Sequence, residues 1–562
     1  MVRRRPIVYQ VLTRLFGNEN TTNTPWGSLA QNGCGKMADI DARALEAIRQ
    51  LGATHVWLTG LLEHATRTDY TAYGIARDHS AVVKGVAGSA YAVKDYYDVD
   101  PDLAVSVPAR MLELEALIDR IHAAGMGVLM DFVPNHVARQ YHSDRRPRGV
   151  HDLGEEDDKG RHFSAQNDFY YFPGQGFYTD FDLCGAEAIP YDEWPARATG
   201  NDVFGAWAGH NDWYETVKLN YGLDYTGDGA LHADPIPALW PKMLDILLFW
   251  AGKGVDGFRC DMAEMVPVEF WQWAIARVRE KHEDILFVAE VYDPSRYRDF
   301  VRRGGFDFLY DKVGLYDTLR EVMCDRRPAS DITACWQQVD DIRDHMLAFL
   351  ENHDEQRIAS EFFAGEAACG CAAMLVAALL GRGGVMVYAG QELGERGMDE
   401  EGFSGRDGRT TIFDYWSVDA LRRWRRGGYD GSLLSAEERA LQAFYARVLH
   451  LAADVVAVEG ERYDLMYANP SSARFDARHV FVFLRHRGKV TWLVAANFAD
   501  REQEVEVRVP QHALDTLGLK TRKQVVWHDL LGGEYSVCCP LCPEVPIVLH
   551  LPARGGVVMC AD

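Results

Sequence analysis

Hydrophobic and polar positions along the chain repeat one pattern: an amphipathic helix, a glycine, and then a short apolar strand. Residues 40–51 carry apolar side chains at helical spacing, end at Gly52, and lead into an apolar strand over 55–58. Short apolar strands that alternate with helices form a parallel sheet buried on both faces, and eight of them favour a closed (β/α)8 TIM barrel. The sequence predicts eight such strands, at 7–11, 55–58, 128–131, 257–261, 285–290, 306–310, 346–350 and 385–388.

Two stretches depart from this pattern. Residues 137–225 follow the third strand, are rich in Asp, Gly, Tyr and Asn, and are far too long for an ordinary loop between a strand and a helix. From 454 onwards apolar and polar residues alternate, as they do in antiparallel strands. We therefore expect a barrel built from 1–136 and 226–453, an inserted subdomain over 137–225, and a C-terminal antiparallel β-sandwich over 454–562.

Composition narrows the range of partners. The formal net charge of −24 opposes binding to nucleic acid or to an anionic membrane, and no apolar run approaches the roughly 18 residues of a membrane span.

The first residues lack the apolar stretch of a signal peptide, which predicts a cytoplasmic protein, or a periplasmic or secreted one if a leader has been removed. The 11 cysteines lack zinc-site spacing, and we interpret Cys538, Cys539 and Cys542 as reduced thiols. The sequence predicts no particular oligomeric state.

Acidic residues stand where several predicted strands end. Asp131, Asp261 and Glu290 close their strands, and Asp354 follows the seventh strand. Such residues can be helix N-caps, but in a barrel the carboxyl ends of all strands meet at one rim, where active sites lie. Retaining cleavage of a glycosidic bond needs two carboxyls about 5–5.5 Å apart, which Asp261 and Glu290 can supply. Arg259 lies on the same face of the strand as Asp261 and can hold that carboxylate ionised.

Four segments resemble the signature regions of the α-amylase superfamily, glycoside hydrolase family 13. They read DFVPNH at 131–136, GFRCD at 257–261, VAEV at 288–291 and ENHD at 351–354. All four occur in the order and at the spacing of that family, on the predicted third, fourth, fifth and seventh strands. The resemblance covers the barrel and implies a retaining enzyme that acts on α-glucans or maltooligosaccharides.

The resemblance also implies a role for each matching residue. Asp261 matches the nucleophile, Glu290 the general acid/base, and Asp354 the carboxylate that binds sugar hydroxyls at the cleavage subsite. The residues that match substrate-binding or orienting positions are Tyr91, Asp131, His136, Arg259 and His353.

The role of several aromatic residues can be interpreted in two ways. Tyr73 is the alternative to Tyr91 as the tyrosine that stacks on the sugar. Trp207, Trp213 and Tyr214 lie in the predicted insert and either stack on sugars or form local core.

The resemblance implies a structural calcium ion as well. Asn135 and Asn220 match two usual ligand positions, and calcium takes several hard oxygen ligands. The loop over 17–23 is similar to a second oxygen-rich site of some relatives, or is an ordinary polar turn.

The match departs from the family at Glu264 and Met265, where many α-amylases carry Lys-His, so a typical contact with the leaving-side sugar is absent.

These observations predict an α-amylase-type hydrolase that cleaves α-1,4-glucosidic bonds through a covalent glycosyl-enzyme. A 4-α-glucanotransferase or an isomerising relative is the alternative, because it shares the catalytic residues and differs only in what takes up the intermediate. A non-catalytic binding protein of the same fold is disfavoured, since Asp261, Glu290 and Asp354 are all present. Linkage preference and endo or exo action stay open.

Overall fold

The computed structural model describes residues 5–533 and 535–561, so residues 1–4, 534 and 562 of the expected domains lie outside the described part. Its centre is a closed barrel of parallel strands, hydrogen-bonded in the order β1-β16-β15-β14-β13-β12-β5-β2. This confirms the predicted barrel, and each strand lies where the hydrophobic pattern puts it. The strands are β1 (Ile7–Leu12), β2 (His55–Thr59), β5 (Gly127–Phe132), β12 (Gly257–Cys260), β13 (Leu286–Ala289), β14 (Phe308–Tyr310), β15 (Met346–Phe349) and β16 (Val385–Tyr388).

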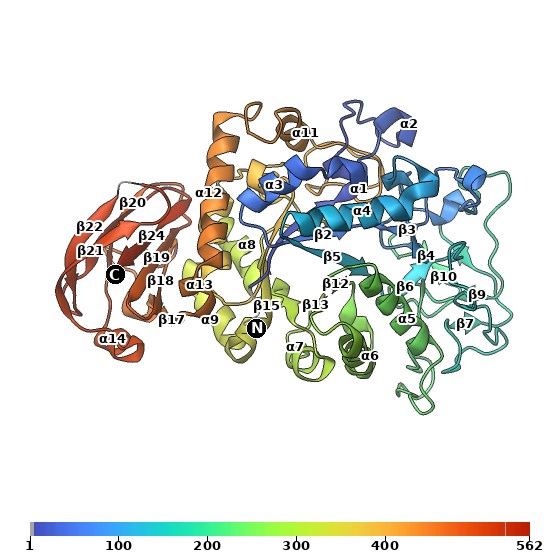
Figure 1. Ribbon diagram of the computed structural model, residues 1–562. Coiled ribbons are helices and arrows are strands. Elements are labelled where there is room, and N and C mark those ends of the chain that lie inside the picture. The colour runs from blue at the N-terminus through green and yellow to red at the C-terminus, as the bar shows by residue number, and fades with distance from the viewer. Residues whose placement is uncertain (1–4, 534, 562) are drawn as a thin grey trace.

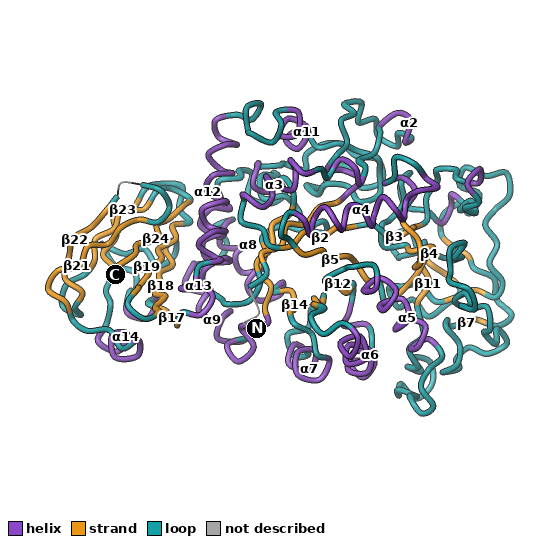
Figure 2. Tube along the Cα trace, in the orientation of Figure 1, coloured by secondary structure: helices purple, strands orange, loops and turns teal. Residues whose placement is uncertain are grey.

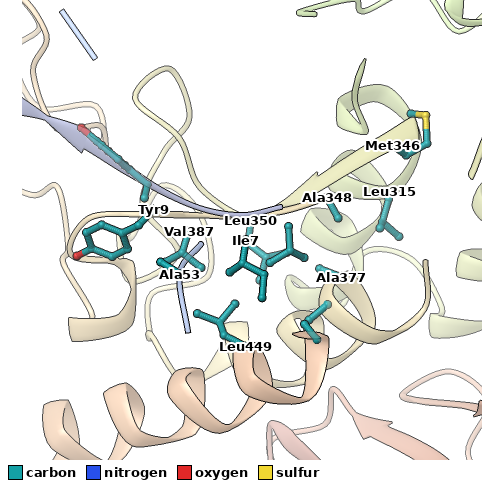
Figure 3. Packing of buried hydrophobic residues seen from close by; sticks show 14 of the residues in the cluster. Ile7, Tyr9, Ala53, Leu315, Met346, Ala348, Leu350, Ala377, Val387 and Leu449 are labelled. Carbon is teal, nitrogen blue, oxygen red and sulfur yellow. The ribbon is translucent and has the colours of Figure 1, made fainter. Parts of the chain in front are cut away.

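Helices cover the outside of the barrel (Figures 1 and 2). Their apolar faces meet the strands: Figure 3 shows Leu449 of α12 near Ile7 of β1 and Val387 of β16, all in one buried cluster. Asp41 caps α3, because its carboxylate accepts hydrogen bonds from the backbone N–H groups of Arg43 and Ala44. The longer helices are α3 (Ala42–Gln50), α4 (Arg110–Ala123), α5 (Leu239–Gly252), α6 (Val268–Lys281), α8 (Asp317–Met323), α9 (Ile332–Gln338), α10 (Cys369–Leu379), α11 (Asp419–Arg426) and α12 (Ala436–Ala453).

The chain between β5 and α5 extends away from the barrel at one end of the molecule (Figure 1). It holds short paired strands and surrounds a buried aromatic cluster of its own, which includes Tyr170, Phe172 and Phe177. The guanidinium of Arg139 lies over the Phe177 ring, 3.7 Å from its centroid. The pairs are β6 (His136–Ala138) with β11 (Thr216–Lys218), β7 (Tyr171–Phe172) with β9 (Ala196–Arg197), and β8 (Tyr178–Thr179) with β10 (Trp207–Ala208).

The C-terminal region is antiparallel, as predicted. One sheet has the order β17-β18-β19-β24-β21-β22, and β20 pairs with β23 in a second. Helix α10 contacts both the barrel strand β15 and the C-terminal strands β19 and β24, which explains why it is apolar on all sides. The elements are β17 (Glu461–Asp464), β18 (Val480–Arg487), β19 (Val490–Asn497), β20 (Gln503–Val507), α14 (Gln511–Leu517), β21 (Arg522–Asp529), β22 (Ser536–Leu541), β23 (Ile547–Leu551) and β24 (Gly555–Ala561).

One segment at the start of this region differs from the alternating pattern expected after 454. Residues Val455–Glu459 form a short helix, α13, before β17 begins. Asp454 starts the helix, since its carboxylate accepts a hydrogen bond of 2.8 Å from the backbone N–H of Val456. The N-cap therefore overrides the strand preference of a valine-rich run.

Two further expectations concern the whole chain. All 11 cysteines are free thiols. Within 5–533 and 535–561, no helix combines the length and the apolarity that crossing a membrane requires.

The loop before β4 (Val93–Val99) offers a test of tight packing near the barrel rim. Gly88 has φ +87°, and a Cβ atom there would lie 1.7 Å from the carbonyl oxygen of Ala65, whereas Gly74 has φ +86° and no atom within 4 Å of its Cβ position. Both alanine variants carry the left-handed penalty of about 1–2 kcal/mol, but only Gly88→Ala adds a backbone clash. We expect Gly88→Ala to lower the Tm clearly more than Gly74→Ala in thermal unfolding. Equal shifts would contradict this packing.

Candidate active site

The predicted catalytic carboxyls line one pocket at the carboxyl rim of the barrel. Asp261 directly follows β12, Glu290 directly follows β13, and Asp354 lies in the loop after β15. These three side chains, with Tyr91 and His136, line a pocket of about 270 Å³. Residues far apart in sequence thus meet because parallel barrel strands all end at the same rim.

Arg259 connects two of the carboxyls that line this pocket. Its guanidinium is 1% exposed and contacts the Asp261 carboxylate at 2.6 Å, the Glu290 carboxylate at 2.9 Å and the Asp131 carboxylate at 3.6 Å. One planar cation therefore holds two carboxyls on neighbouring strands within a few ångströms of each other. A retaining glycosidase needs its two carboxyls about 5–5.5 Å apart, which this arrangement allows.

Glu290 is held by two further donors. The Tyr292 hydroxyl donates to Oε1 at 2.5 Å, and the backbone N–H of Met262 donates to Oε2 at 2.7 Å. Met262 has φ 43° and ψ 40°, the left-handed conformation, which costs a non-glycine residue about 1–2 kcal/mol. The strained turn after Asp261 thus points a backbone donor at Glu290.

Burial governs the protonation of these groups. It raises the pKa of Asp261, against the opposing effect of the Arg259 guanidinium. It also raises the pKa of Glu290, to which the Asp261 charge adds. The pKa of Asp354 is raised as well, by removal from solvent and by Glu290. Since Asp261 raises the pKa of both Glu290 and Asp354, and Glu290 raises that of Asp354, the three carboxyls do not ionise independently and titrate as a coupled group.

A second layer of predicted residues lies beneath and beside the pocket. The Tyr91 hydroxyl contacts Nε2 of His353 at 2.5 Å and donates to Oδ1 of Asp131 at 3.2 Å. The rings of Tyr91 and His353 are stacked, with centroids 5.1 Å apart. The indole N–H of Trp57 donates to the other oxygen of Asp131. Tyr91 therefore lies at the site, whereas Tyr73 is 49% exposed and stands beside Tyr70 instead.

The predicted histidines are both neutral. Burial and the nearby Lys218 and Lys84 lower the pKa of His136 to about 3. Burial, with the Arg259 charge, lowers the pKa of His353 well below its usual range. Neutral imidazoles can accept or donate single hydrogen bonds to a sugar without adding charge to the pocket.

Sequence reasoning missed several pocket residues. Lys84 and Glu215 form an ion pair of 3.1 Å in the wall, both nearly buried. Neither belongs to a signature segment, so no local signal marks them. Tyr292 could have been found, because it stands two residues after Glu290 and so faces the same side of the strand end.

The three aromatic residues considered in the insert, Trp207, Trp213 and Tyr214, lie in different environments. Trp213 lines the pocket, and its ring is 5.1 Å from that of His136. Tyr214 is buried in the cluster of the insert, and Trp207 is 42% exposed. Only Trp213 is placed to contact a ligand in this pocket.

The expected calcium ligands do not fit a metal ion, which corrects the assignment of Asn135 and Asn220. The side-chain oxygen of Asn135 accepts a hydrogen bond of 2.7 Å from the ammonium group of Lys218. Lys218 is 2% exposed and lies 2.5 Å from the carboxylate of Asp202. The side-chain oxygen of Asn220 accepts from the backbone N–H of Gly222 at 2.9 Å. A lysine ammonium thus supplies the positive charge at this position, and a calcium ion beside it would be repelled.

The loop over 17–23 is a polar turn. The side-chain oxygen of Asn18 accepts from the backbone N–H of Asn20, and that of Asn20 accepts from Thr22. The side-chain oxygen of Asn23 accepts a hydrogen bond from the backbone N–H of Ser417. Acidic groups that could hold a metal lie elsewhere: among the described residues they are Asp224, Asp228 and His232, and Glu63, Asp98 and Asp144.

The closed barrel, with carboxyl groups gathered at the carboxyl ends of its strands, places the chain among the (β/α)8-barrel enzymes with an acidic active site. The family model of the α-amylase catalytic domain matches residues 10–425. The chain therefore belongs to the α-amylase family, glycoside hydrolase family 13.

Individual relatives are distant. The chain is 25% identical over 574 residues to an α-amylase of Streptomyces lividans. The alignment covers 92% of this chain and 55% of that relative. It is 24% identical over 406 residues to α-amylase MalA of Haloarcula japonica, and this alignment covers 70% of this chain and 45% of that relative. The chain spans about half the length of these relatives.

Solved structures share the fold. An α-amylase from Geobacillus thermoleovorans in complex with acarbose has a TM-score of 0.63 at 18% identity, covering 99% of this chain and 98% of the other. A maltogenic α-amylase, AmyB, from Thermotoga neapolitana has a TM-score of 0.61 at 17% identity, covering 100% and 99%. At these identities the likeness shows the fold alone.

The Lys218 contact can be tested by removing its charge. In Lys218→Met we expect a lower Tm, because Asn135 loses its buried donor and Asp202 its partner, a cost of about 1–3 kcal/mol. Thermal unfolding with and without a chelator should give the same difference from the wild type. The control is Lys253→Met, whose pair with Glu115 is partly exposed and worth about 0–1 kcal/mol. A wild-type Tm in Lys218→Met, or a difference that chelation abolishes, would refute the assignment.

Proposed function

We propose that this protein is a retaining α-glucan hydrolase that cleaves α-1,4-glucosidic bonds in starch or maltooligosaccharides. The observation that carries the proposal is the pair of buried carboxyls, Asp261 and Glu290, held against the single guanidinium of Arg259. Membership in the α-amylase family supports the substrate class.

In the proposed first step, Asp261 attacks the anomeric carbon while Glu290 donates its proton to the glycosidic oxygen. The bond from that carbon to the leaving sugar breaks, and a glycosyl ester on Asp261 forms. In the second step Glu290 takes a proton from water, whose oxygen attacks the same carbon and frees Asp261. Arg259 favours the ionised form of Asp261, which the attack requires.

The surrounding residues take supporting roles in this proposal. Asp354 and the neutral His136 and His353 bind hydroxyls of the sugar at the cleavage point. Tyr91 stacks on its ring, while Asp131 anchors Tyr91 and Arg259. Each of these groups either lines the pocket or contacts a residue that does.

Transfer to a second sugar in place of water is the alternative outcome of the same intermediate. A short stretch, 88 residues at 32% identity, matches an α-1,4-glucan:maltose-1-phosphate maltosyltransferase of Cereibacter sphaeroides. Product analysis with maltoheptaose distinguishes the two. A rise in reducing ends equal to the bonds broken supports hydrolysis, whereas redistribution of chain lengths without new reducing ends would favour transfer.

We also propose that the protein works in a reducing compartment, which is the cytoplasm. The support is its set of free cysteines, several of them partly exposed. We likewise propose that residues 137–225 act as a subdomain that completes the pocket wall, since Trp213, Glu215 and Thr216 line it.

Removal of the nucleophile should abolish turnover without unfolding the protein. We expect Asp261→Asn to lower kcat by more than about a thousandfold, or about 4 kcal/mol of barrier, with a near-normal circular dichroism spectrum. The matched control is Asp256→Asn, at the opposite end of the same strand, where the side chain pairs with His122. That variant should keep its activity. Residual activity of Asp261→Asn within about tenfold of the wild type is too high for a lost nucleophile.

Glu290 should control the alkaline side of the pH profile. Because burial and Asp261 raise its pKa, kcat/KM should fall only as the pH rises well above about 4.3, the value of an ordinary glutamate. On the acid side the rate should fall as Asp261 takes up a proton.

The Glu290→Gln variant separates acid catalysis from other roles. Glycosyl fluorides need no proton for departure, so they should retain far more activity than maltooligosaccharides, and the alkaline limb should vanish. Equal loss with both substrates would assign the proton to another group.

A further inference from the structure

A second acidic cluster lies outside the pocket, where the hairpin of β3 (Leu62–His64) and β4 meets the segment after β6 (Figure 1). Carboxylate oxygens of Glu63, Asp98 and Asp144 all lie within 4.8 Å of one another. Glu63 and Asp98 are 1% and 2% exposed, while Asp144 reaches the surface. Three separate segments therefore bring oxygen ligands to one point.

Glu63 is the feature that sets this cluster apart. Both of its carboxylate oxygens are buried and have no hydrogen-bond donor. The closest cation is Arg110, whose guanidinium is 3.9 Å from Glu63 but is committed to Asp98 and to the carbonyl of Val107. A buried carboxylate without a hydrogen-bond donor is costly, and the guanidinium beside Glu63 is already bound to Asp98.

The local charges give the size of that deficit. Asp95 pairs with Glu63 across the hairpin and adds a fourth carboxylate to the three of the cluster. Two guanidiniums face them: Arg110, and Arg145 at 3.5 Å from Asp98. Lys94, the remaining nearby cation, is paired with Asp78. Four carboxylates against two guanidiniums leave a charge of −2 when all are ionised.

A divalent ion would satisfy both orphan oxygens and neutralise the deficit at once.

We propose that Glu63, Asp98 and Asp144 bind a calcium ion. All three donors are hard oxygens, with no thiol or imidazole among them, which disfavours zinc and copper. Calcium tolerates irregular ligand sets contributed from separate segments, whereas magnesium requires a near-ideal octahedron. The bound ion ties the β3–β4 hairpin, whose connecting loop carries Tyr91, to the first part of the insert.

The other acidic group provides a matched comparison. Asp224, Asp228 and His232 also lie within 4.8 Å of one another, but on an exposed loop. Their carboxylates already accept hydrogen bonds from Thr226 and Ala230. This group has no buried orphan oxygen, so it is not part of the proposed site.

The test uses the full chain, stripped with a chelator and titrated with CaCl2 in a calorimeter and in thermal unfolding. We expect saturable binding of one ion and a rise in Tm for the wild type. Glu63→Gln keeps the shape and removes the charge, so it should fold, be at least as stable as the wild type in chelator, and bind calcium at least about tenfold more weakly, because affinity follows ligand charge.

Two more variants complete the design. Asp144→Asn, at the partly exposed ligand, should also weaken binding, whereas Asp228→Asn should bind calcium as the wild type does. No binding by the wild type up to millimolar calcium would overturn the proposal. So would full retention of the Tm rise in both Glu63→Gln and Asp144→Asn, or its loss in Asp228→Asn.

Discussion

The buried guanidinium of Arg259 is the interaction on which the active site depends. It stands between three carboxylates and under the ring of Tyr91, whose centroid is 5.4 Å away. A cation buried to this degree is tolerated only because it is surrounded by opposite charge. Conversely, Asp261 and Glu290 could not lie so close together without it. One side chain thus holds the two carboxyls side by side and favours the ionised form of each.

The barrel and the central residues could be predicted because both follow from local rules. Each barrel strand is buried on two faces, so it is a short apolar run, and its last residue faces the rim. Asp131, Asp261 and Glu290 are visible for that reason. The resemblance to family signatures added His136 and His353, and it distinguished the rim carboxylates, Asp354 among them, from helix caps.

What could not be predicted depends on contacts across the chain. Lys218 is an ordinary residue of a short strand until the loop that carries Asp202, with φ +64°, brings a carboxylate to it. Nothing local marks Glu63 in the short strand β3, and only the path of the insert brings Asp144 close. Lys84 and Glu215 meet in the pocket wall from different loops. In each case the partner is decided by loop conformation, which carries no period that a sequence pattern could reveal.

The lysine at Asn135 has a consequence for how the insert responds to its surroundings. A metal ion at a joint is a separate molecule, so the joint loosens whenever the free ion falls below its dissociation constant. An ammonium group on the chain cannot be diluted away, since its local concentration is fixed by its tether. The joint between β6 and β11 should therefore hold at any calcium concentration, and a chelating agent would leave it intact.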